Sequence, residues 1–176
     1  MSTRRIKNYL HQLGIPESYG RSPELALYSE PAELVEAGPN IIGRMQRLAP
    51  SAAKAWAGLQ AAAAADSIEL LIVSGFRSID DQAKLIFNKL EAGQAIEDIL
   101  KVNTAPGYSQ HHTGRAIDIA TPGVRPLTEP FDQSPAFLWL DAHAESFGFR
   151  MPYGYNNEWG LNYEPWHWFL SEERDQ

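Results

Sequence analysis

The sequence predicts an α+β domain in which helices flank a small, mostly antiparallel sheet. Three observations predict this class. Apolar residues recur at helical spacing in the first half of the chain, short β-rich runs follow later, and helical segments lie between those runs. Helices that come first, with short strands after them, are typical of α+β packing.

The first forty residues are expected to form an N-terminal arm. Residues 1–13 predict a short amphipathic helix, because four apolar residues fall at helical spacing: Ile6, Tyr9, Leu10 and Leu13. Residues 14–39 are rich in Pro, Gly, Ser and Glu and predict an irregular chain with a brief helix near 31–38. We therefore divide the chain into an arm over 1–40 and a single domain over 41–176.

Two helices are predicted at the start of the domain. One runs from Asn40 to Pro50, and the next covers 51–66 with Ser51 as its N-cap. Alanine dominates the second helix, which favours helical backbone. Three of its apolar residues share one face: Trp56, Leu59 and Ala63.

The middle of the chain predicts a strand followed by two helices. Residues 68–76 form a short β-rich apolar run, as expected of a buried strand. Residues 78–93 predict a helix with Ser78 as its N-cap and Gly93 at its end. Residues 95–103 predict a further short helix.

The last third of the chain predicts the remaining strands. Residues 115–120 alternate in polarity and indicate a strand. The helix over 134–148 has Ser134 as its N-cap, Pro135 at its first position and Gly148 at its end. Two final strands are expected at 147–151 and 164–170.

Composition excludes several classes of function. The formal net charge is −7 and the pI is near 5.2, which argues against nucleic acid or an anionic membrane as the main partner. No apolar run approaches a membrane span, and the N-terminus does not resemble a secretory signal. We expect a cytoplasmic product, with action in the periplasm or cell wall by another export route as the alternative. The chain has no cysteine, so any metal must be held by His, Asp or Glu.

A metal site is indicated by the stretch GYSQHHTGRAIDIA at 107–120. On a strand over 115–120, Asp118 shares one face with two alanines, while the isoleucines point into the core. The turn just before this strand can fold His111 or His112 back toward the carboxylate, and the sequence alone leaves open which one. Zinc suits such nitrogen and oxygen donors when no thiol is present.

A catalytic zinc site needs three protein ligands and an open position. The other histidines are His11, His143 and His167. Only His167 has a carboxylate three residues away, at Glu164. This segment can therefore supply a third ligand together with a base for a metal-activated water. The competing interpretation is a solvated glutamate beside a structural histidine.

The combined motifs closely resemble the VanY-type zinc D-alanyl-D-alanine carboxypeptidases of the LAS superfamily, over roughly residues 70–170. The residues that carry the resemblance are SGFRS, Gln82, SQHHTGRAIDI, FGF and EPWHW. The resemblance implies a Hedgehog/DD-peptidase-like fold whose sheet carries one Zn²⁺ ion. It assigns His111, Asp118 and His167 as the zinc ligands and Glu164 as the catalytic base.

The same resemblance implies a site for the terminal carboxylate of the substrate. Arg77 would hold that carboxylate, assisted by Gln82 and Ser109, and Trp166 would help to shape the pocket. Independently of the family, an arginine just before a helix N-terminus is electrostatically disfavoured, which suggests an anion clamp. The competing interpretation is an ordinary surface ion pair with Asp80 or Asp81.

The expected activity is removal of a C-terminal D-amino acid, D-Ala, from peptidoglycan stem peptides or muropeptides. The enzymatic alternatives are an L,D-carboxypeptidase and an endolysin-type endopeptidase that cuts within stems or cross-links. A zinc-bearing binding module without catalysis is disfavoured because Glu164 is present. A zinc-free structural domain is the fourth hypothesis. Neither the muropeptide nor the oligomeric state is fixed by the sequence.

Overall fold

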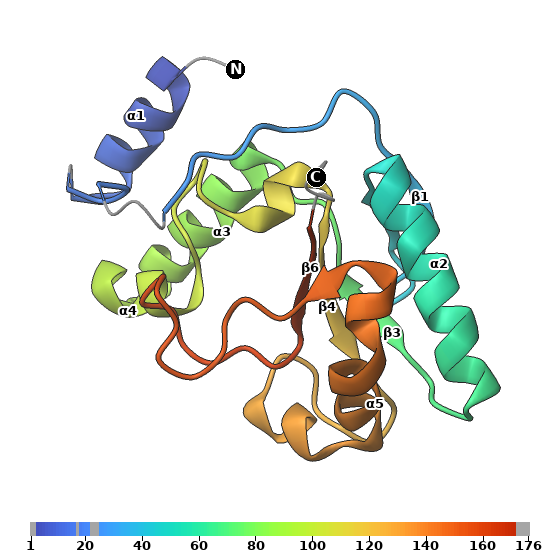
Figure 1. The fold of residues 1–176 in the computed structure, drawn as a ribbon. Helices are drawn as coiled ribbons and strands as arrows, with labels where there is room; N and C mark the ends of the chain where they lie inside the picture. The colour runs from blue at the N-terminus through green and yellow to red at the C-terminus, as the bar shows by residue number, and fades with distance from the viewer. Residues whose placement is uncertain (1–2, 17, 22–24, 172–176) are drawn as a thin grey trace.

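The computed structural model describes residues 3–16, 18–21 and 25–171, and helices surround an antiparallel sheet within it (Figure 1). The strands are β1 (Val35–Pro39), β2 (Met45–Leu48), β3 (Leu71–Ser74), β4 (Ala116–Ala120), β5 (Phe149–Arg150) and β6 (His167–Leu170). The α-helices are α1 (Thr3–Gln12), α2 (Pro50–Ala65), α3 (Ile79–Glu91), α4 (Ile96–Val102) and α5 (Pro135–His143). Short 3₁₀ helices are η1 (Gln110–Thr113), η2 (Glu129–Gln133) and η3 (Ala144–Phe147). Within the described ranges, none of the helices combines the length and apolar character that crossing a bilayer requires.

The main sheet has the order β3-β4-β6-β5 with antiparallel pairing throughout, which confirms the predicted α+β class. Strand β4 lies inside this sheet, between β3 and β6. Its two isoleucines are almost fully buried, with Ile117 0% and Ile119 1% exposed. Because side chains alternate along a strand, the residue between them faces the opposite side of the sheet.

Two apolar clusters lie on the two sides of this sheet. The isoleucines of β4 pack with Trp56 of α2 and Leu140 of α5. A second cluster joins α1, α3 and α4, with Ile86 and Ile99 fully buried in it. Figure 1 shows α2 and α5 on one side of the strands and α3 and α4 on the other. The sheet face toward α3 and α4 is therefore free of the main core and can carry polar groups.

The helix caps agree with the sequence at α3 but not at α2. The Ser78 hydroxyl accepts a hydrogen bond from Asp81 N–H and caps α3, as predicted. Helix α2 begins at Pro50 with Ala49 in the cap position, so Ser51 is not its N-cap. Proline at the first helical position has no N–H to satisfy there, which favours this earlier start.

The predictions of a brief helix near 31–38 and a helix from Asn40 to Pro50 are wrong. Both stretches form the β1–β2 hairpin instead. The Asn40 side-chain oxygen accepts from the N–H groups of Ile42 and Arg44, and Gly43 adopts a φ of 78°. These hydrogen bonds to the Asn40 side chain and the left-handed conformation of Gly43 close a tight turn, which is incompatible with a continuous helix.

The hairpin supports the loop that follows β3. Phe76 N–H donates to the carbonyl of Arg47, and Gly75 N–H donates to the side-chain oxygen of Gln46. A Cβ at Gly75 would come within 2.8 Å of the Arg47 carbonyl oxygen, so only glycine fits this approach. The loop from Gly75 to Arg77 is thereby held between the hairpin and α3.

The remaining elements largely follow the sequence. The predicted N-terminal helix is present as α1, and Tyr9 at its exposed side donates to Asp80 across 2.6 Å. The helix expected over 134–148 has Ser134 as its N-cap, but α5 ends at His143 and η3 completes the stretch. The division of the chain at residue 40 stays a prediction.

Candidate metal centre

Two candidate ligands come from neighbouring strands. Asp118 of β4 and His167 of β6 are partners in the register of the sheet. Both are buried, with 5% and 2% of their surfaces exposed. His167 Nδ1 lies 3.0 Å from Asp118 Oδ1. The alternation that places Ile117 and Ile119 in the core thus puts a carboxylate on the opposite face, beside an imidazole from the next strand.

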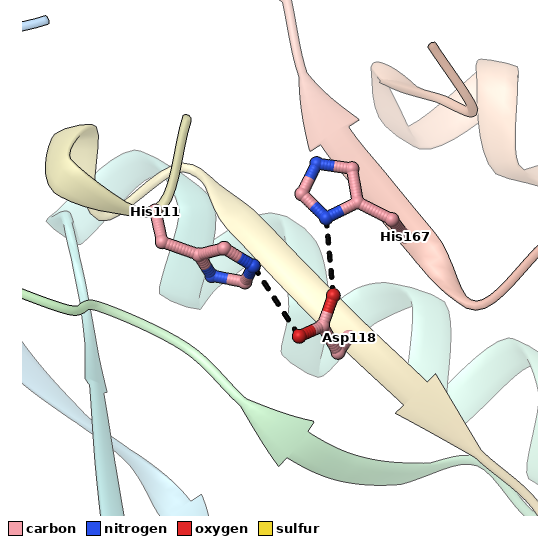
Figure 2. A group of neighbouring side chains, drawn as sticks. All are labelled: His111, Asp118 and His167. Atoms are coloured by element: carbon pink, nitrogen blue, oxygen red, sulfur yellow. Dashed lines mark hydrogen bonds and ion pairs between the residues drawn. The ribbon is translucent and has the colours of Figure 1, made fainter. Parts of the chain in front are cut away.

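The structure brings His111, and not His112, to this pair. His111 lies in η1, which is capped by the Ser109 hydroxyl and ends at Gly114 with a φ of 66°. This tight turn directs the imidazole back over β4, so that His111 Nε2 lies 3.3 Å from Asp118 Oδ2. Figure 2 shows the two rings on either side of the carboxylate. The ligand atoms of the three residues all lie within 4.8 Å of one another.

The protons on the two imidazoles can be assigned from their other contacts. His111 Nδ1 lies 2.7 Å from the carbonyl oxygen of Gly75, which can only accept, so Nδ1 carries the proton of the neutral ring. His167 Nε2 lies 2.9 Å from Gln110 Oε1, and the same reasoning places its proton there. Both rings therefore present lone pairs toward the carboxylate of Asp118.

The charges of these groups favour a bound cation. Burial raises the pKa of Asp118, but positive charge and hydrogen bonds from protonated His111 and His167 outweigh burial and hold that pKa well below its usual range. When both rings are neutral with lone pairs toward the carboxylate, a bound cation would supply that charge instead. Burial lowers the pKa of His167, so this imidazole is neutral at pH 7. Lone pairs and an anionic carboxylate that face one another repel unless a cation lies between them.

The donor set fits zinc in particular. Two imidazole nitrogens and one carboxylate oxygen are common zinc ligands, and three protein ligands leave one position open. Each imidazole is also held through its other nitrogen by a backbone carbonyl or an amide oxygen, as is usual for histidines that bind metals. The chain has no thiol to compete with these donors.

Gln110 is a contributor that the sequence analysis missed. Its side chain is 4% exposed and accepts from His167 Nε2–H. The two residues lie 57 positions apart, so no local spacing connects them. The only signal in the sequence is a polar side chain within a segment otherwise assigned to a turn.

Glu164 lies beside the cluster and is 9% exposed. Its backbone N–H donates to Tyr153 O across 2.9 Å, and its carbonyl accepts from His167 N–H. Burial raises the pKa of Glu164 to about 8, the charge of Asp118 adds to the rise, and Arg77 and Lys89 oppose it. A carboxylate with a raised pKa is a suitable proton acceptor and donor near neutral pH.

A cavity of about 400 Å³ opens over the cluster. The predicted ligands and Glu164 line it, and so do the four predicted substrate-binding residues: Arg77, Gln82, Ser109 and Trp166. The structure therefore brings all the predicted site residues to one cavity. Their roles stay predictions, because geometry alone does not test them.

Arg77 points into this cavity and away from the acidic residues of α3. Its Nη1 donates to Gln82 Oε1 across 2.8 Å, and its Nη2 lies 4.0 Å from Asp118 Oδ2. The competing pairing is not formed, since Asp80 accepts from Tyr9 and Asp81 is bonded to Ser78. Gln82 is itself fixed, because its amide donates to the Thr104 carbonyl across 2.6 Å.

Some of the nearby aromatic residues line the cavity and others do not. Tyr153 stacks on His167 with ring centroids 4.6 Å apart and lines the cavity. Trp166 precedes β6, which begins at His167, and lines the same cavity. Tyr155 lies outside the cavity lining: it is 68% exposed and stacks on Tyr163.

The other histidines lie outside the cluster. His143 is at the end of α5 with its ring beside Trp139, and His11 is exposed on α1. His112 is fully buried, and its ring nitrogens bond only to backbone groups of Arg77 and Gly107. Residue spacing alone could not separate His112 from His111 because the two are adjacent, and only the family resemblance indicated His111.

Comparisons with known proteins agree with this geometry. Residues 45–171 match the family model for VanY, D-alanyl-D-alanine carboxypeptidase. A D-alanyl-D-alanine carboxypeptidase of Enterococcus faecalis (strain ATCC 700802 / V583) is 28% identical over 117 residues, covering 61% of this chain and 42% of that protein. The chain spans 28–42% of the length of the curated relatives it matches.

Solved structures resemble most of the fold. The LdcB LD-carboxypeptidase has a TM-score of 0.71 and 31% identity, covering 82% of this chain and 71% of that one. A VanY D,D-pentapeptidase variant in complex with Zn(II) has a TM-score of 0.61 and 24% identity, covering 84% and 87%. The α+β architecture of this chain is therefore that of these carboxypeptidases.

Proposed function

The chain belongs to the VanY family of D-alanyl-D-alanine carboxypeptidases, and we propose that it is a zinc peptidase that removes the C-terminal D-amino acid from peptidoglycan stem peptides. The observation that carries this proposal is a single cavity that brings together three kinds of group. It holds the His111, Asp118 and His167 cluster, the buried carboxylate of Glu164, and a guanidinium that is not paired with a neighbouring acid of α3.

The proposed zinc ligands are His111 Nε2, Asp118 and His167 Nδ1. Support comes from the donor set, from the assigned imidazole protons, and from the VanY structure of the same fold in complex with Zn(II). When bound, the ion would supply Lewis acidity to the scissile carbonyl and lower the pKa of water.

Arg77 is the proposed anchor for the terminal carboxylate of the peptide. A planar guanidinium binds a carboxylate through two parallel hydrogen bonds, and Gln82 already fixes one of its edges. Ser109, at the cap of η1, also lines the cavity and offers a hydroxyl. Trp166 supplies an apolar wall that would limit the orientation of the peptide.

Glu164 is the proposed proton carrier. Its carboxylate would take a proton from the attacking water and deliver it to the departing amine, so no covalent bond to the protein forms. Burial, and after it the negative charge of Asp118, raises the pKa of Glu164 and therefore strengthens it as a base. Arg77 and Lys89 offset part of this cost, and a divalent cation would offset more.

One alternative specificity is favoured by a particular observation. The LdcB LD-carboxypeptidase is the more similar of the two structures described above, with 31% identity and a TM-score of 0.71. An L,D-carboxypeptidase that trims tetrapeptide stems would use the same ligands, base and carboxylate anchor. The two specificities differ in the configuration of the residue before the scissile bond.

The decisive experiment is digestion of defined pentapeptide, tetrapeptide and cross-linked stems, followed by mass spectrometry with and without a chelator. We expect loss of one terminal D-Ala that depends on zinc. Cleavage of the tetrapeptide alone would assign L,D activity, and cleavage of the cross-link would assign an endopeptidase. Zinc binding without cleavage of any stem would leave a binding module and overturn the proposal.

A further inference from the structure

Lys89 lies on the wall of the same cavity, on the helix that carries Gln82. Along α3, the residues that line the cavity are Gln82, Leu85 and Lys89, which follow the spacing of one helical face. Lys89 stands seven residues beyond Gln82, or about 10 Å along the helix axis. A ligand group bound at Lys89 is therefore offset along the helix from the carboxylate that Arg77 and Gln82 would hold.

The ammonium of Lys89 has a neutral partner. Its Nζ donates to the side-chain oxygen of Asn103, at the end of α4. Over the part of the chain that the structure describes, no carboxylate lies within ion-pair distance of this nitrogen. An ammonium has three donors, so two remain for a ligand. Asn103 also lines the cavity and can offer its amide N–H₂.

The surroundings make this arrangement costly in the absence of a ligand. Burial lowers the pKa of Lys89, and the charge of Arg77 lowers it further, while Glu164 opposes the shift. A half-buried cation without a counter-ion is stabilised by any anion that enters the cavity. A lysine without a ligand-binding role is more stable when exposed to water, as Lys84 is on the outer side of the same helix.

From this arrangement we infer that Lys89 and Asn103 form a second anion subsite, which binds a side-chain carboxylate of the residue preceding the scissile bond. The inference rests on the L,D-carboxypeptidase form of the proposed function, because in a D-Ala-D-Ala substrate the residue before the scissile bond has no side-chain carboxylate. Leu85, Val102 and Leu161 line the cavity around this subsite and suit the methylene groups of such a side chain.

The distance to be spanned favours the residue before the scissile bond over the terminal residue. Within a single C-terminal Asp or Glu, the two carboxylates lie only about 5 Å apart, since each carbon–carbon bond adds about 1.5 Å at most. The preceding residue begins one Cα step, about 3.8 Å, further along the chain. A side chain of four or five carbons from there covers the roughly 10 Å between Gln82 and Lys89. Diaminopimelate, which carries a second carboxylate at the end of such a side chain, has the required chemistry.

The test compares three tetrapeptides that differ only in the residue before the terminal D-Ala: diaminopimelate, its side-chain amide, and lysine. For the zinc-loaded wild type, we expect kcat/KM for the free carboxylate to exceed that for the amide by roughly 10- to 100-fold, as for one charge-assisted hydrogen bond. Lys89→Met should reduce this ratio to about one, and the matched control Lys84→Met should keep it. Lys89→Gln serves as the second variant if Lys89→Met does not fold.

Three results would overturn the inference. One is a wild type that hydrolyses all three peptides with kcat/KM equal within about twofold. Another is a Lys89→Met variant that slows all three peptides equally, because that pattern indicates an effect on Glu164 alone. The third is a wild type that removes D-Ala from the pentapeptide but hydrolyses none of these tetrapeptides, which leaves the proposed function intact. If the wild type hydrolyses neither the pentapeptide nor the tetrapeptides, the proposed function fails. Calorimetric titration with the intact peptides then tests the subsite separately. The subsite is supported if the wild type binds the free-carboxylate peptide more tightly than the amide and Lys89→Met binds both equally. It is contradicted if the wild type binds both peptides equally.

Discussion

The buried ring of His112 fixes the backbone of Arg77, because its Nδ1 lies 2.7 Å from the Arg77 carbonyl oxygen. Its Nε2 accepts from Gly107 N–H across 3.1 Å, so the ring joins two loops. Burial lowers the pKa of His112 to about 4, so it stays neutral at physiological pH. The adjacent histidines therefore have separate tasks, with His111 facing the cluster and His112 supporting the loop of Arg77.

Substitutions at the two histidines should have different effects. His111→Ala removes a proposed ligand, and we expect bound zinc to fall from about one equivalent to a trace by elemental analysis. His112→Gln keeps one donor and one acceptor, so we expect full zinc content and a loss in unfolding free energy of about 1–3 kcal/mol. Zinc loss in His112→Gln with retention in His111→Ala would reverse these assignments.

Gln110 should affect zinc affinity without binding the ion. Gln110→Leu removes the acceptor for His167 Nε2–H, so the imidazole is no longer fixed with its free nitrogen toward the site. We expect zinc affinity to fall roughly 10- to 100-fold in a competition titration with a chromophoric chelator. Gln110→Glu retains an acceptor and is the control. Equal affinities for Gln110→Leu and the wild type would contradict the proposed orientation of His167.

Glu164→Gln should separate turnover from metal binding. The amide has nearly the same shape but cannot accept the proton, so we expect kcat on a D-Ala-terminated stem to fall about 10²- to 10⁴-fold. Zinc content should stay near one equivalent, because Glu164 is not among the three clustered ligands. Retention of more than half the wild-type kcat would remove Glu164 from its proposed role.

The stability of the metal-free protein should depend on Glu164 and pH. The pKa of Glu164 is about 8 in the folded protein against 4.5 for the free group, so folding takes up a proton between these values. The stabilisation is complete below about pH 4.5 and is lost as the pH rises through about 8. By denaturant titration, we expect wild type to lose roughly 2–5 kcal/mol more than Glu164→Gln across this window. Parallel curves for the two proteins would show that Glu164 does not titrate there.

Arg77→Met should weaken binding of the terminal carboxylate selectively. A charged hydrogen-bonding pair at a partly buried site corresponds to about 1.5–3 kcal/mol, so we expect kcat/KM for a free-carboxylate peptide to fall at least tenfold. A C-terminal amide of the same peptide, already a poor substrate, should change little. If both peptides are affected equally, Arg77 does not act as a carboxylate anchor. Arg47→Met, in the neighbouring hairpin, is the control for loss of a nearby arginine.

The sequence predicted the elements whose ends carry local signals. Ser78 and Ser134 both cap the helices expected of them, and the alternation over 115–120 placed Asp118 on the polar face of β4. The β1–β2 hairpin was misassigned to two helical segments, near 31–38 and from Asn40 to Pro50. Its turn depends on side-chain bonding by Asn40, which competes with helix formation in a way that spacing does not reveal.

The site was predictable as a set of residue types but not as a geometry. The family resemblance implied His111, Asp118, His167 and Glu164. Spacing alone left the choice between His111 and His112 open, because that choice depends on the direction of the η1 turn. Gln110 contributes only through a partner 57 positions away. Long-range contacts of this kind arise from the pairing of β4 with β6, which no local pattern encodes.

The pairing of Asp118 with His167 also makes the distance between these two side chains independent of the length of the chain between them. They are 49 positions apart, yet the ladder of β4 and β6 sets their separation. The intervening segment includes Leu140 of the core and Glu164 of the cavity, but its exposed loop positions can vary in length and composition while the two side chains keep their spacing. Such variation leaves the two side chains in place, provided that the ladder does not slip by one residue, which would turn His167 to the far side of the sheet.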